Sequence, residues 1–171
     1  MKWIERKKDN KSVIEILGII FLLLCICRKI IKICVIIINA VKLKDARRSR
    51  AYNKVLSDWI YYNYDCEKFE KALSRKRMKR IAIYGVGTLG ELFYRTIENS
   101  NIEIACFIDK SAEDEEGING IPLYKLDNYE YEGDIDAIIV TAVFDIDEIT
   151  EDLLEKEVPK KKIVSLEKIV R

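Results

Sequence analysis

The chain has 171 residues, enough for one folded domain and an additional segment, and it carries 30 basic and 29 acidic residues. This balance hides a division, because residues 1–80 hold 21 Lys and Arg against 8 Asp and Glu, whereas residues 81–171 hold 9 against 21. The acidic second half argues against nucleic acid as a partner. The absence of histidine excludes Ser-His-Asp, Cys-His and H-E-x-x-H chemistry.

The five cysteines follow neither a disulfide pattern nor a metal-binding pattern. Their number is odd, no pair forms C-x-x-C, and three of them fall within an apolar N-terminal stretch. We therefore expect reduced thiols that serve in packing, and we expect no metal site.

The N-terminal part of the chain contains a long apolar stretch that is interrupted by cations. Residues 16–27 are apolar throughout and residues 30–41 are nearly so, with Arg28, Lys29 and Lys32 between and within them. A single helix over this stretch is long enough to cross a bilayer. It would, however, place the three cations near its middle, at about 2.5–3.5 kcal/mol each. A simple membrane crossing is therefore disfavoured.

A basic amphipathic helix fits the second half of this stretch better. Its polar stripe consists of Arg28, Lys32, Asn39 and Lys42, with Val35 as the one apolar member. Such a helix lies in a membrane interface with its lysines directed to the headgroups. Both flanks are basic, with Lys2, Arg6, Lys7, Lys8 and Lys11 before the stretch and Lys42, Lys44, Arg47, Arg48 and Arg50 after it.

The charge pattern predicts that both ends of this stretch lie at the cytoplasmic face of the cell membrane, in contact with anionic lipids. The alternatives are a cleaved signal peptide, which lacks a small-x-small site here, and a soluble helix pair that binds a partner. Whether the segment spans, re-enters or lies on the membrane stays open at this point. We predict three parts: a membrane-associated helical segment over 1–45, a connector over 46–79 and a nucleotide-binding domain over 80–171.

The connector is basic, aromatic and predicted to be helical. Phe69 and Leu73 are expected to pack against the following domain, whereas Trp59, with Tyr61, Tyr62 and Tyr64, is expected at a membrane interface. Residues 64–68 spell Y-x-x-x-K, the acid–base pair of short-chain dehydrogenases. In those enzymes the pair follows the glycine loop, so we regard it as coincidental here and leave the catalytic residues unknown.

A strand followed by a glycine-rich turn is the most informative motif of the chain. The apolar residues 81–84 lead directly into Gly85-Val-Gly87-Thr-Leu-Gly90, a G-x-G-x-x-G pattern at the start of a predicted helix over 88–99. Gly85 allows a tight turn, Gly87 allows backbone N–H groups to approach a diphosphate, and Gly90 allows close packing of the helix. The helix start also favours an anion. The predicted phosphate-binding residues are Gly85, Gly87, Thr88, Leu89 and Gly90.

A second strand, predicted over residues 102–108, ends in an acid. Asp109 follows Gly90 by 19 residues, and in a β-α-β unit such an acid can reach the ribose hydroxyls of a nucleotide. The alternative role is that of a solvated turn residue. Asp109 would repel a 2′-phosphate and so favours NAD over NADP, although the neighbouring Lys110, which we include in the cofactor site, weakens this preference.

The remaining elements alternate between strand and helix. We predict a strand entering at 118–124, a helical turn within 126–131, a buried strand over 136–141, a helix over 145–156 and a strand over 162–166. Right-handed crossovers then predict an α/β fold with a single Rossmann-like parallel sheet of about five strands in the order 3-2-1-4-5. Thr141, at the end of the fourth strand, either contacts a ribose or phosphate or caps the following segment.

Several segments of this domain resemble, in the same order along the chain, segments of known protein families. They are IAIYGVGTLGE (81–91), FIDK (107–110), GIPLYKLD (120–127), DAIIVTAVFDIDEI (136–149) and KIVSLEKI (162–169). They resemble the NAD(P)-binding, nucleoside-diphosphate-sugar-epimerase-like domains of bacterial surface-polysaccharide proteins. They are also similar to the N-terminal nucleotide-sugar-binding domain of sugar acetyltransferases. The resemblance implies nucleotide binding more firmly than a reaction, because neither β-helix acyltransferase repeats nor an epimerase Tyr/Lys pair follows.

Three functions are compatible with these features. The first is a membrane-attached cytosolic binding module that holds NAD, or NADP or a UDP-sugar instead, beside a glycan-assembly enzyme. The second is a small NAD-dependent oxidoreductase or nucleotide-sugar epimerase whose acid and base come from a partner or a second protomer. The third is a structural scaffold with an empty, vestigial site.

Overall fold

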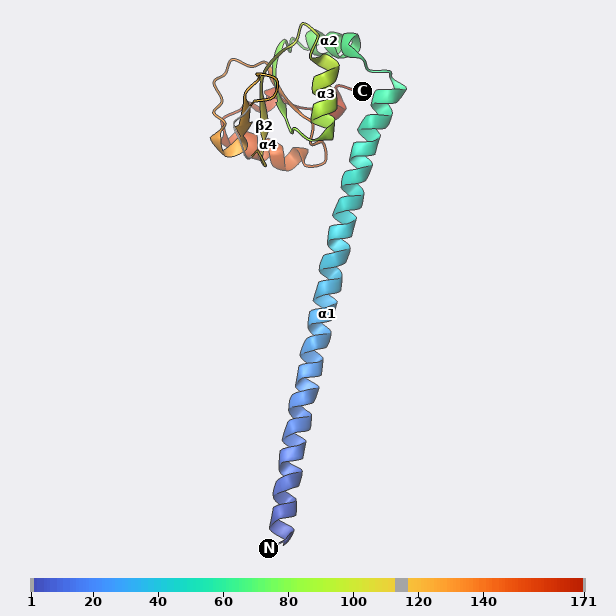
Figure 1. Ribbon diagram of the computed structural model, residues 1–171, viewed down its shortest axis with the longest axis vertical. Coiled ribbons are helices and arrows are strands. Elements are labelled where there is room, and N and C mark those ends of the chain that lie inside the picture. The colour runs from blue at the N-terminus through green and yellow to red at the C-terminus, as the bar shows by residue number, and fades with distance from the viewer. Residues whose placement is uncertain (1, 113–116, 171) are drawn as a thin grey trace. The chain divides into compact units, whose positions relative to one another are not determined.

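The computed structural model describes residues 2–112 and 117–170, with the side chains of Leu17, Gly18 and all described residues from Phe21 onward. The chain divides into two compact units, residues 1–46 and 47–171. Helix α1 (Lys2–Tyr61) supplies the first unit and the beginning of the second (Figure 1).

The second unit is built on a five-stranded parallel sheet. Its strands are β1 (Arg80–Tyr84), β2 (Glu103–Asp109), β3 (Leu123–Lys125), β4 (Ala137–Val140) and β5 (Ile163–Ser165). They lie in the order β3-β2-β1-β4-β5, and each neighbouring pair is parallel. The predicted α/β fold and its strand order are therefore confirmed. Residues 81–84 of β1 and all residues of β4 are apolar and buried, since helices cover the sheet on both faces.

Short helices connect the strands. They are α2 (Cys66–Arg75), α3 (Thr88–Ile97) and α4 (Ile146–Glu155), with 3₁₀ turns η1 (Leu126–Asn128), η2 (Lys160–Lys162) and η3 (Leu166–Lys168). The start of α2 is fixed by Asp65, whose carboxylate accepts a hydrogen bond from the Lys68 N–H at 2.9 Å. The helices predicted over 88–99 and 145–156 are confirmed, with ends that differ by up to two residues.

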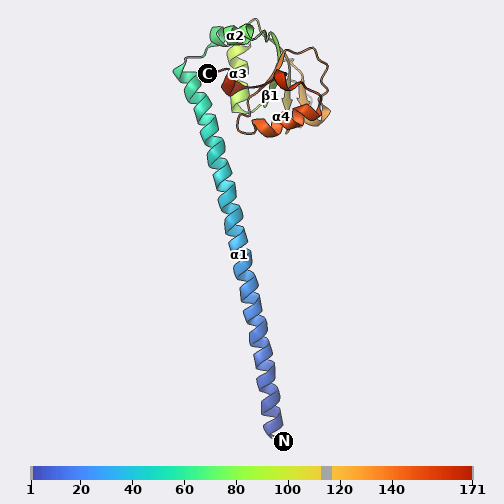
Figure 2. The same cartoon turned by 180° about the vertical axis from the view of Figure 1, so that it is seen from behind.

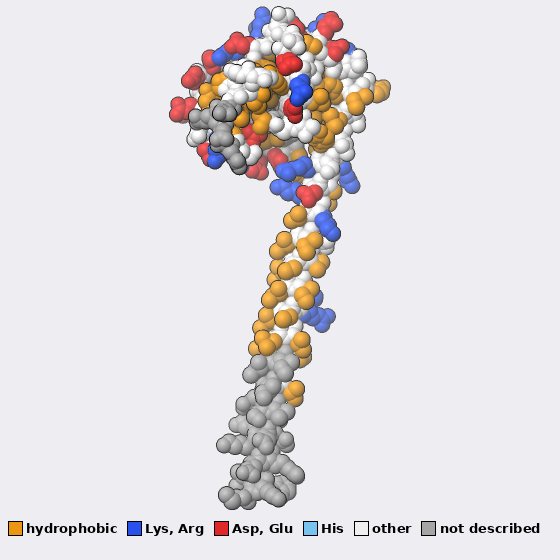
Figure 3. All heavy atoms as spheres, viewed as in Figure 1, with side chains coloured by type: hydrophobic (Ala, Val, Ile, Leu, Met, Phe, Trp, Pro, Cys, Tyr) orange, Lys and Arg blue, Asp and Glu red, His pale blue; other side chains and the backbone are white. Residues whose placement is uncertain are grey.

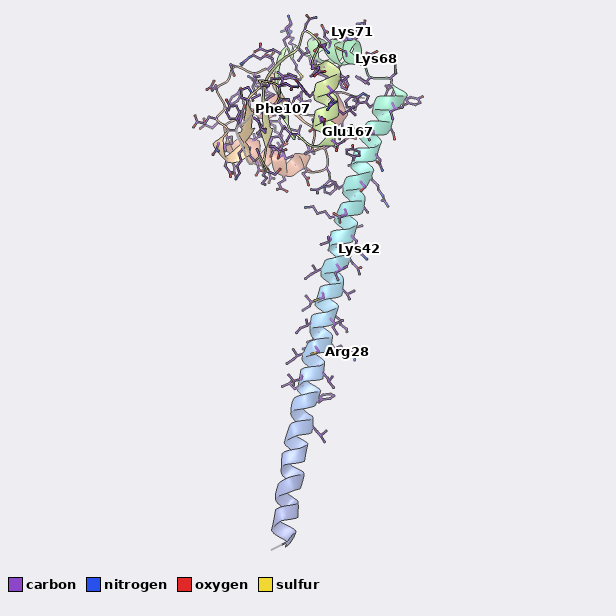
Figure 4. The ribbon with its side chains drawn as sticks, in the orientation of Figure 1. Arg28, Lys42, Lys68, Lys71, Phe107 and Glu167 are labelled. Carbon is purple, nitrogen blue, oxygen red and sulfur yellow. The ribbon has the colours of Figure 1, made fainter. Side chains whose placement is uncertain are left out.

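Alternate residues of β1 enter two separate cores. Ile81 and Ile83 pack with α2, α3 and the end of α1, whereas Ala82 and Tyr84 pack with α4. Figure 1 shows α2 and α3 together, and Figure 2 shows β1 and α4 from behind. Phe107, labelled in Figure 4, belongs to the first core, where its ring lies 5.3 Å from that of Tyr94. The sheet therefore has a helical layer on each face.

The last turns of α1 belong to the first core. Trp59 is only 7% exposed, its ring lies 4.7 Å from that of Phe69, and its indole N–H donates to the Tyr64 carbonyl at 2.7 Å. Phe69 and Leu73 are fully buried, as predicted. The prediction of an interfacial Trp59 is wrong, because the apolar face of α2 packs against this side chain. Tyr61 is exposed.

The first unit is helical, as predicted for the N-terminal segment. Among the residues that the structure describes, no helix is both long enough and apolar enough to cross a membrane. Large apolar side chains between Leu17 and Leu43 are exposed. The side chains of the basic flank at residues 2–11 lie outside the described ones. Contact of this segment with a membrane stays a prediction.

Candidate nucleotide-binding site

Two glycines of the loop after β1 are required by the backbone conformation and packing of the fold. Gly85 has a φ of +95°, and a Cβ at this position would lie 2.8 Å from Oγ1 of Thr141. A Cβ on Gly90 would lie 1.9 Å from the Gly85 carbonyl oxygen, because α3 starts directly beside the turn. Any larger residue would strain the backbone at the first position and collide with it at the second. Both positions therefore need glycine whether or not a ligand binds.

Gly87 is different from the other two glycines. Its φ of −71° and ψ of −175° describe an extended conformation that any residue adopts, and a Cβ there would meet no atom within 4 Å. Gly87 is also the N-cap of α3, and no side chain caps the N–H groups of the first turn. The described part of the chain thus gives no steric reason for glycine at this position.

Thr141 joins the end of β4 to the end of β1. Its hydroxyl donates to the carbonyl oxygens of Tyr84 and Gly85, at 3.0 and 2.9 Å, and its side chain is buried. These hydrogen bonds give Thr141 a structural role at the end of β1, which differs from the predicted capping of the segment after β4. Contact with a ribose or phosphate through the remaining lone pairs stays a prediction.

Asp109 connects the end of β2 to the glycine loop. Its Oδ2 accepts a hydrogen bond from the Val86 N–H at 2.9 Å, and its Oδ1 accepts from the N–H and hydroxyl of Ser111, at 2.8 and 2.7 Å. Partial burial raises the pKa of Asp109, but these three hydrogen bonds outweigh that effect and hold the pKa below its ordinary value. The carboxylate is therefore ionised at neutral pH and keeps acceptor capacity for a further donor.

Lys110 is held by acidic residues of α4. Its ammonium lies 3.0 Å from Glu148 and 3.2 Å from Asp152. These hydrogen bonds, that to Glu148 first, raise the pKa of Lys110. Although it follows Asp109 in the sequence, Lys110 is not among the residues that line the cavity at the glycine loop. Its predicted contact with a cofactor stays untested.

A cavity of about 280 Å³ lies at the glycine loop. Of the predicted residues, Gly85, Gly87, Thr88, Leu89, Gly90, Asp109 and Thr141 line it. Its volume is close to the lower end of the range of about 300–1,000 Å³ for small-molecule sites. The cavity is at the carboxyl ends of β1, β2 and β4, where α/β sheets bind their ligands.

Residues that the sequence did not indicate complete the wall of this cavity. They are Arg48 and Tyr52 from α1, with Val143, Phe144 and Asp145 from the segment after β4. The Arg48 guanidinium lies 2.8 Å from the carboxylate of Asp145 and 5.8 Å from the centre of the Phe144 ring. The local sequence around Arg48 resembles any solvated basic helix, so only the folded chain shows its position.

The other unusual titratable groups are not suited to acid–base chemistry at neutral pH. Burial raises the pKa of Tyr84 to about 12 and that of Cys106 to about 11, so both stay protonated. In the Y-x-x-x-K segment, Tyr64 donates to the Ile169 carbonyl, and Lys68 donates to a carbonyl of its own connector. Within residues 2–112 and 117–170, no group of Cys, Asp and Glu is arranged to hold a metal ion.

The parallel sheet, the glycine loop and the acid at the end of β2 define the second unit as a Rossmann-like domain. Residues 77–164 match the family described as C2185-like, N-terminal, and the chain belongs to this family. No solved structure matches the chain.

The chain is also similar to curated proteins named redox-sensing transcriptional repressor Rex. The Rex protein of Listeria welshimeri is 33% identical over 132 residues, which cover 70% of this chain and 61% of that protein. The protein of Bacillus cytotoxicus is 34% identical over 127 residues, covering 68% and 60%, and that of Bacillus cereus is 36% identical over 114 residues, covering 60% and 54%. The chain thus spans about 60% or less of the length of these relatives.

Proposed function

We propose that the second unit binds the diphosphate of a nucleotide at the glycine loop, with NAD(H) as the first candidate. The observation that carries this proposal is the free space at Gly87, where the chain itself would accept a side chain. A diphosphate that approaches the backbone N–H groups at the start of α3 explains the glycine, because a Cβ would occupy the position of the ligand. Gly85 and Gly90 are not evidence for a ligand, since the fold alone requires glycine at both positions.

The charged groups around the cavity support a nucleotide without a 2′-phosphate. The ionised Asp109 can accept a hydrogen bond from a ribose hydroxyl, and it would repel a phosphate at the same position. Lys110, the cation next to it, is held by Glu148 and Asp152. Both observations favour NAD(H) over NADP(H).

Arg48 provides a cation for the phosphates. Its guanidinium lies at the cavity in an exposed ion pair with Asp145. An exposed pair of this kind contributes little stability, whereas arginine binds phosphate oxygens through two parallel hydrogen bonds. A bound diphosphate can therefore take the place of Asp145 as the partner of Arg48.

The similarity to Rex repressors supports NAD(H) among the nucleotides. The sequence resemblance to nucleotide-sugar-binding domains supports a UDP-sugar as the second candidate, in which case the domain would act beside a glycan-assembly enzyme. Both ligands contain a diphosphate bonded to a ribose, so the same loop and acid serve either one. The described residues at the cavity include no acid–base pair that favours an oxidoreductase or an epimerase, so the proposal is limited to binding.

Calorimetric titration of the full chain with NADH, NAD, NADPH and a UDP-sugar tests this proposal. We expect NADH or NAD to bind more tightly than about 1 mM, and at least tenfold more tightly than NADPH. In the Gly87→Val variant the affinity should fall at least tenfold, while the melting temperature stays close to that of the wild type.

Gly18→Ala is the matched control for this variant. Gly18 also lacks any neighbour within 4 Å of its Cβ and has an ordinary φ, but it belongs to the first unit and not to the unit that contains the loop. Its replacement should leave the affinity unchanged. Absence of binding by all four nucleotides would instead support a scaffold with an empty site, and unchanged affinity in Gly87→Val would contradict the phosphate-binding role. Preferential binding of the UDP-sugar would select the second candidate.

A further inference from the structure

The first unit is a single helix whose apolar side chains are extensively exposed. Within α1, large apolar side chains are 45–70% exposed at fifteen positions: Leu17, Phe21, Leu22, Leu23, Leu24, Ile26, Ile30, Ile31, Ile33, Val35, Ile36, Ile37, Ile38, Val41 and Leu43. Figure 3 shows these side chains along the helix, with basic groups between them. Soluble proteins rarely expose a continuous apolar surface of this extent, so something covers it.

The distribution of the apolar residues favours a surrounding medium over a partner helix. Successive residues of a helix point about 100° apart, so the run at 21–24 places apolar side chains around α1, and of the run at 35–38 only Val35 falls on the side that carries Arg28 and Lys32. One partner helix would cover a single a/d stripe and leave the other sides in water. The hydrocarbon and headgroup region of a lipid bilayer can contact several sides at once.

The basic residues of this segment indicate that such a bilayer would be anionic. Arg28, Lys29 and Lys32 are exposed among the apolar side chains, and further cations follow at Lys42 and Lys44. Arg28 and Lys42, both labelled in Figure 4, belong with Lys32 to one polar stripe of the helix. Long basic side chains in such a stripe direct their charges to headgroups while their stems contact the apolar region. Their charge is complementary to anionic phospholipids.

We propose that residues 17–44 bind the surface of an anionic phospholipid bilayer, with α1 lying along the headgroup region and not across the membrane. A crossing would place Arg28, Lys29 and Lys32 near the centre of the hydrocarbon layer, whereas a surface position leaves these cations at the phosphates. The anionic cytoplasmic leaflet of a bacterial membrane is the corresponding natural surface.

The cysteines of the chain provide native probes for this arrangement. Cys25, Cys27 and Cys34 are exposed on the apolar part of α1, whereas Cys66 is half-buried in the second unit. The full chain is mixed with vesicles of phosphatidylcholine alone or with 30% phosphatidylglycerol, and each thiol is quantified by mass spectrometry after reaction with a water-soluble maleimide. With the anionic vesicles, we expect labelling of the three α1 cysteines to fall at least fivefold, while labelling of Cys66 stays unchanged.

A pair of charge variants separates this site from general electrostatic attraction. The triple variant Arg28→Gln, Lys29→Gln, Lys32→Gln should lower binding to the anionic vesicles at least tenfold in a sedimentation assay. The matched variant Arg75→Gln, Lys160→Gln, Lys161→Gln removes the same charge from exposed positions of the second unit. It should change binding less than twofold.

Four outcomes would overturn the proposal. The first is that the chain does not sediment with anionic vesicles, and the second is that both triple variants lose binding equally. The third is that the α1 cysteines are protected without lipid in a concentration-dependent oligomer, which would identify a second copy as the occupant. The fourth is that the vesicle-bound chain resists extraction at pH 11, which would indicate a helix that crosses the bilayer.

Discussion

The two ends of the parallel sheet use their polar groups in different ways. At the amino end, Asp136 accepts hydrogen bonds from the N–H groups of Lys79 and Arg80, and the Arg80 side chain pairs with Glu103 and Asp134. At the carboxyl end, the N-cap of α3 is Gly87, which has no side chain to cap the first turn, and the glycine loop borders a cavity. The polar groups named at the amino end form hydrogen bonds within the chain, whereas Gly87 gives the first turn of α3 no side-chain cap. This difference supports the carboxyl end as the place where we propose that a ligand binds.

The largest effect on stability is expected at Gly90, where α3 packs directly against the glycine loop at the carboxyl end of the sheet. In Gly90→Ala the new Cβ would lie 1.9 Å from the Gly85 carbonyl oxygen, so that α3 has to move away from β1. We expect a loss of about 3 kcal/mol in the free energy of unfolding, measured by urea denaturation. A loss below about 1 kcal/mol would show that the loop is more tolerant than its geometry indicates, and the contrast with Gly87 would then disappear.

An intermediate effect is expected at the amino end. Asp136→Ala removes the acceptor for two backbone N–H groups, and because the site is exposed we expect a loss of about 1 kcal/mol. Hydrogen bonds from the N–H groups of Arg80 and Lys79 lower the pKa of Asp136. A lowered pKa stabilises the fold above the unfolded value of about 3.9, and this contribution is lost as the pH falls through the folded pKa.

Urea denaturation at a series of pH values tests this behaviour. The difference between wild type and Asp136→Ala should be constant near neutrality and shrink below about pH 4. Asp127→Ala, at an exposed position with a long contact of 3.8 Å to Lys125, is the control and should show a smaller difference. A difference for Asp136→Ala that grows toward acid pH would contradict the assigned hydrogen bonds.

The smallest effect on stability is expected at Arg48, whose proposed role is to bind the phosphates of the ligand. Arg48→Gln removes an exposed ion pair and should cost less than about 0.5 kcal/mol in unfolding free energy. The affinity for NADH should nevertheless fall about tenfold, because a charged contact to phosphate is lost. Arg95→Gln, which removes an exposed pair with Glu91 on α3, should leave the affinity unchanged in the same calorimetric titration. Equal affinities of wild type and Arg48→Gln would exclude a phosphate contact.

Short-range sequence patterns were sufficient for the sheet and for the glycine loop. Apolar runs identify β1 and β4 because both faces of these strands are covered, and the spacing of Gly85 and Gly90 reflects a close approach of α3 to the turn. The strand order followed from the alternation of strands and helices together with right-handed crossovers.

Contacts between distant segments could not be predicted in the same way. Arg48 precedes the glycine loop by 37 residues, and the partners of Lys110 on α4 follow it by 38 and 42 residues. Trp59 was misassigned because a local aromatic cluster looks the same whether it contacts lipid or another helix. These side chains find their partners only when the chain is folded.

The hydrogen bond from the Val86 N–H to Asp109 fixes the glycine loop before any ligand arrives. A nucleotide that binds there meets a loop already in its final shape, so little backbone entropy has to be lost at that moment. Association should then occur in a single kinetic step, limited by diffusion and orientation and not by loop closure. The Asp109 carboxylate, which would bind the ribose, would then also affect the association rate constant, because it holds the loop in its binding conformation.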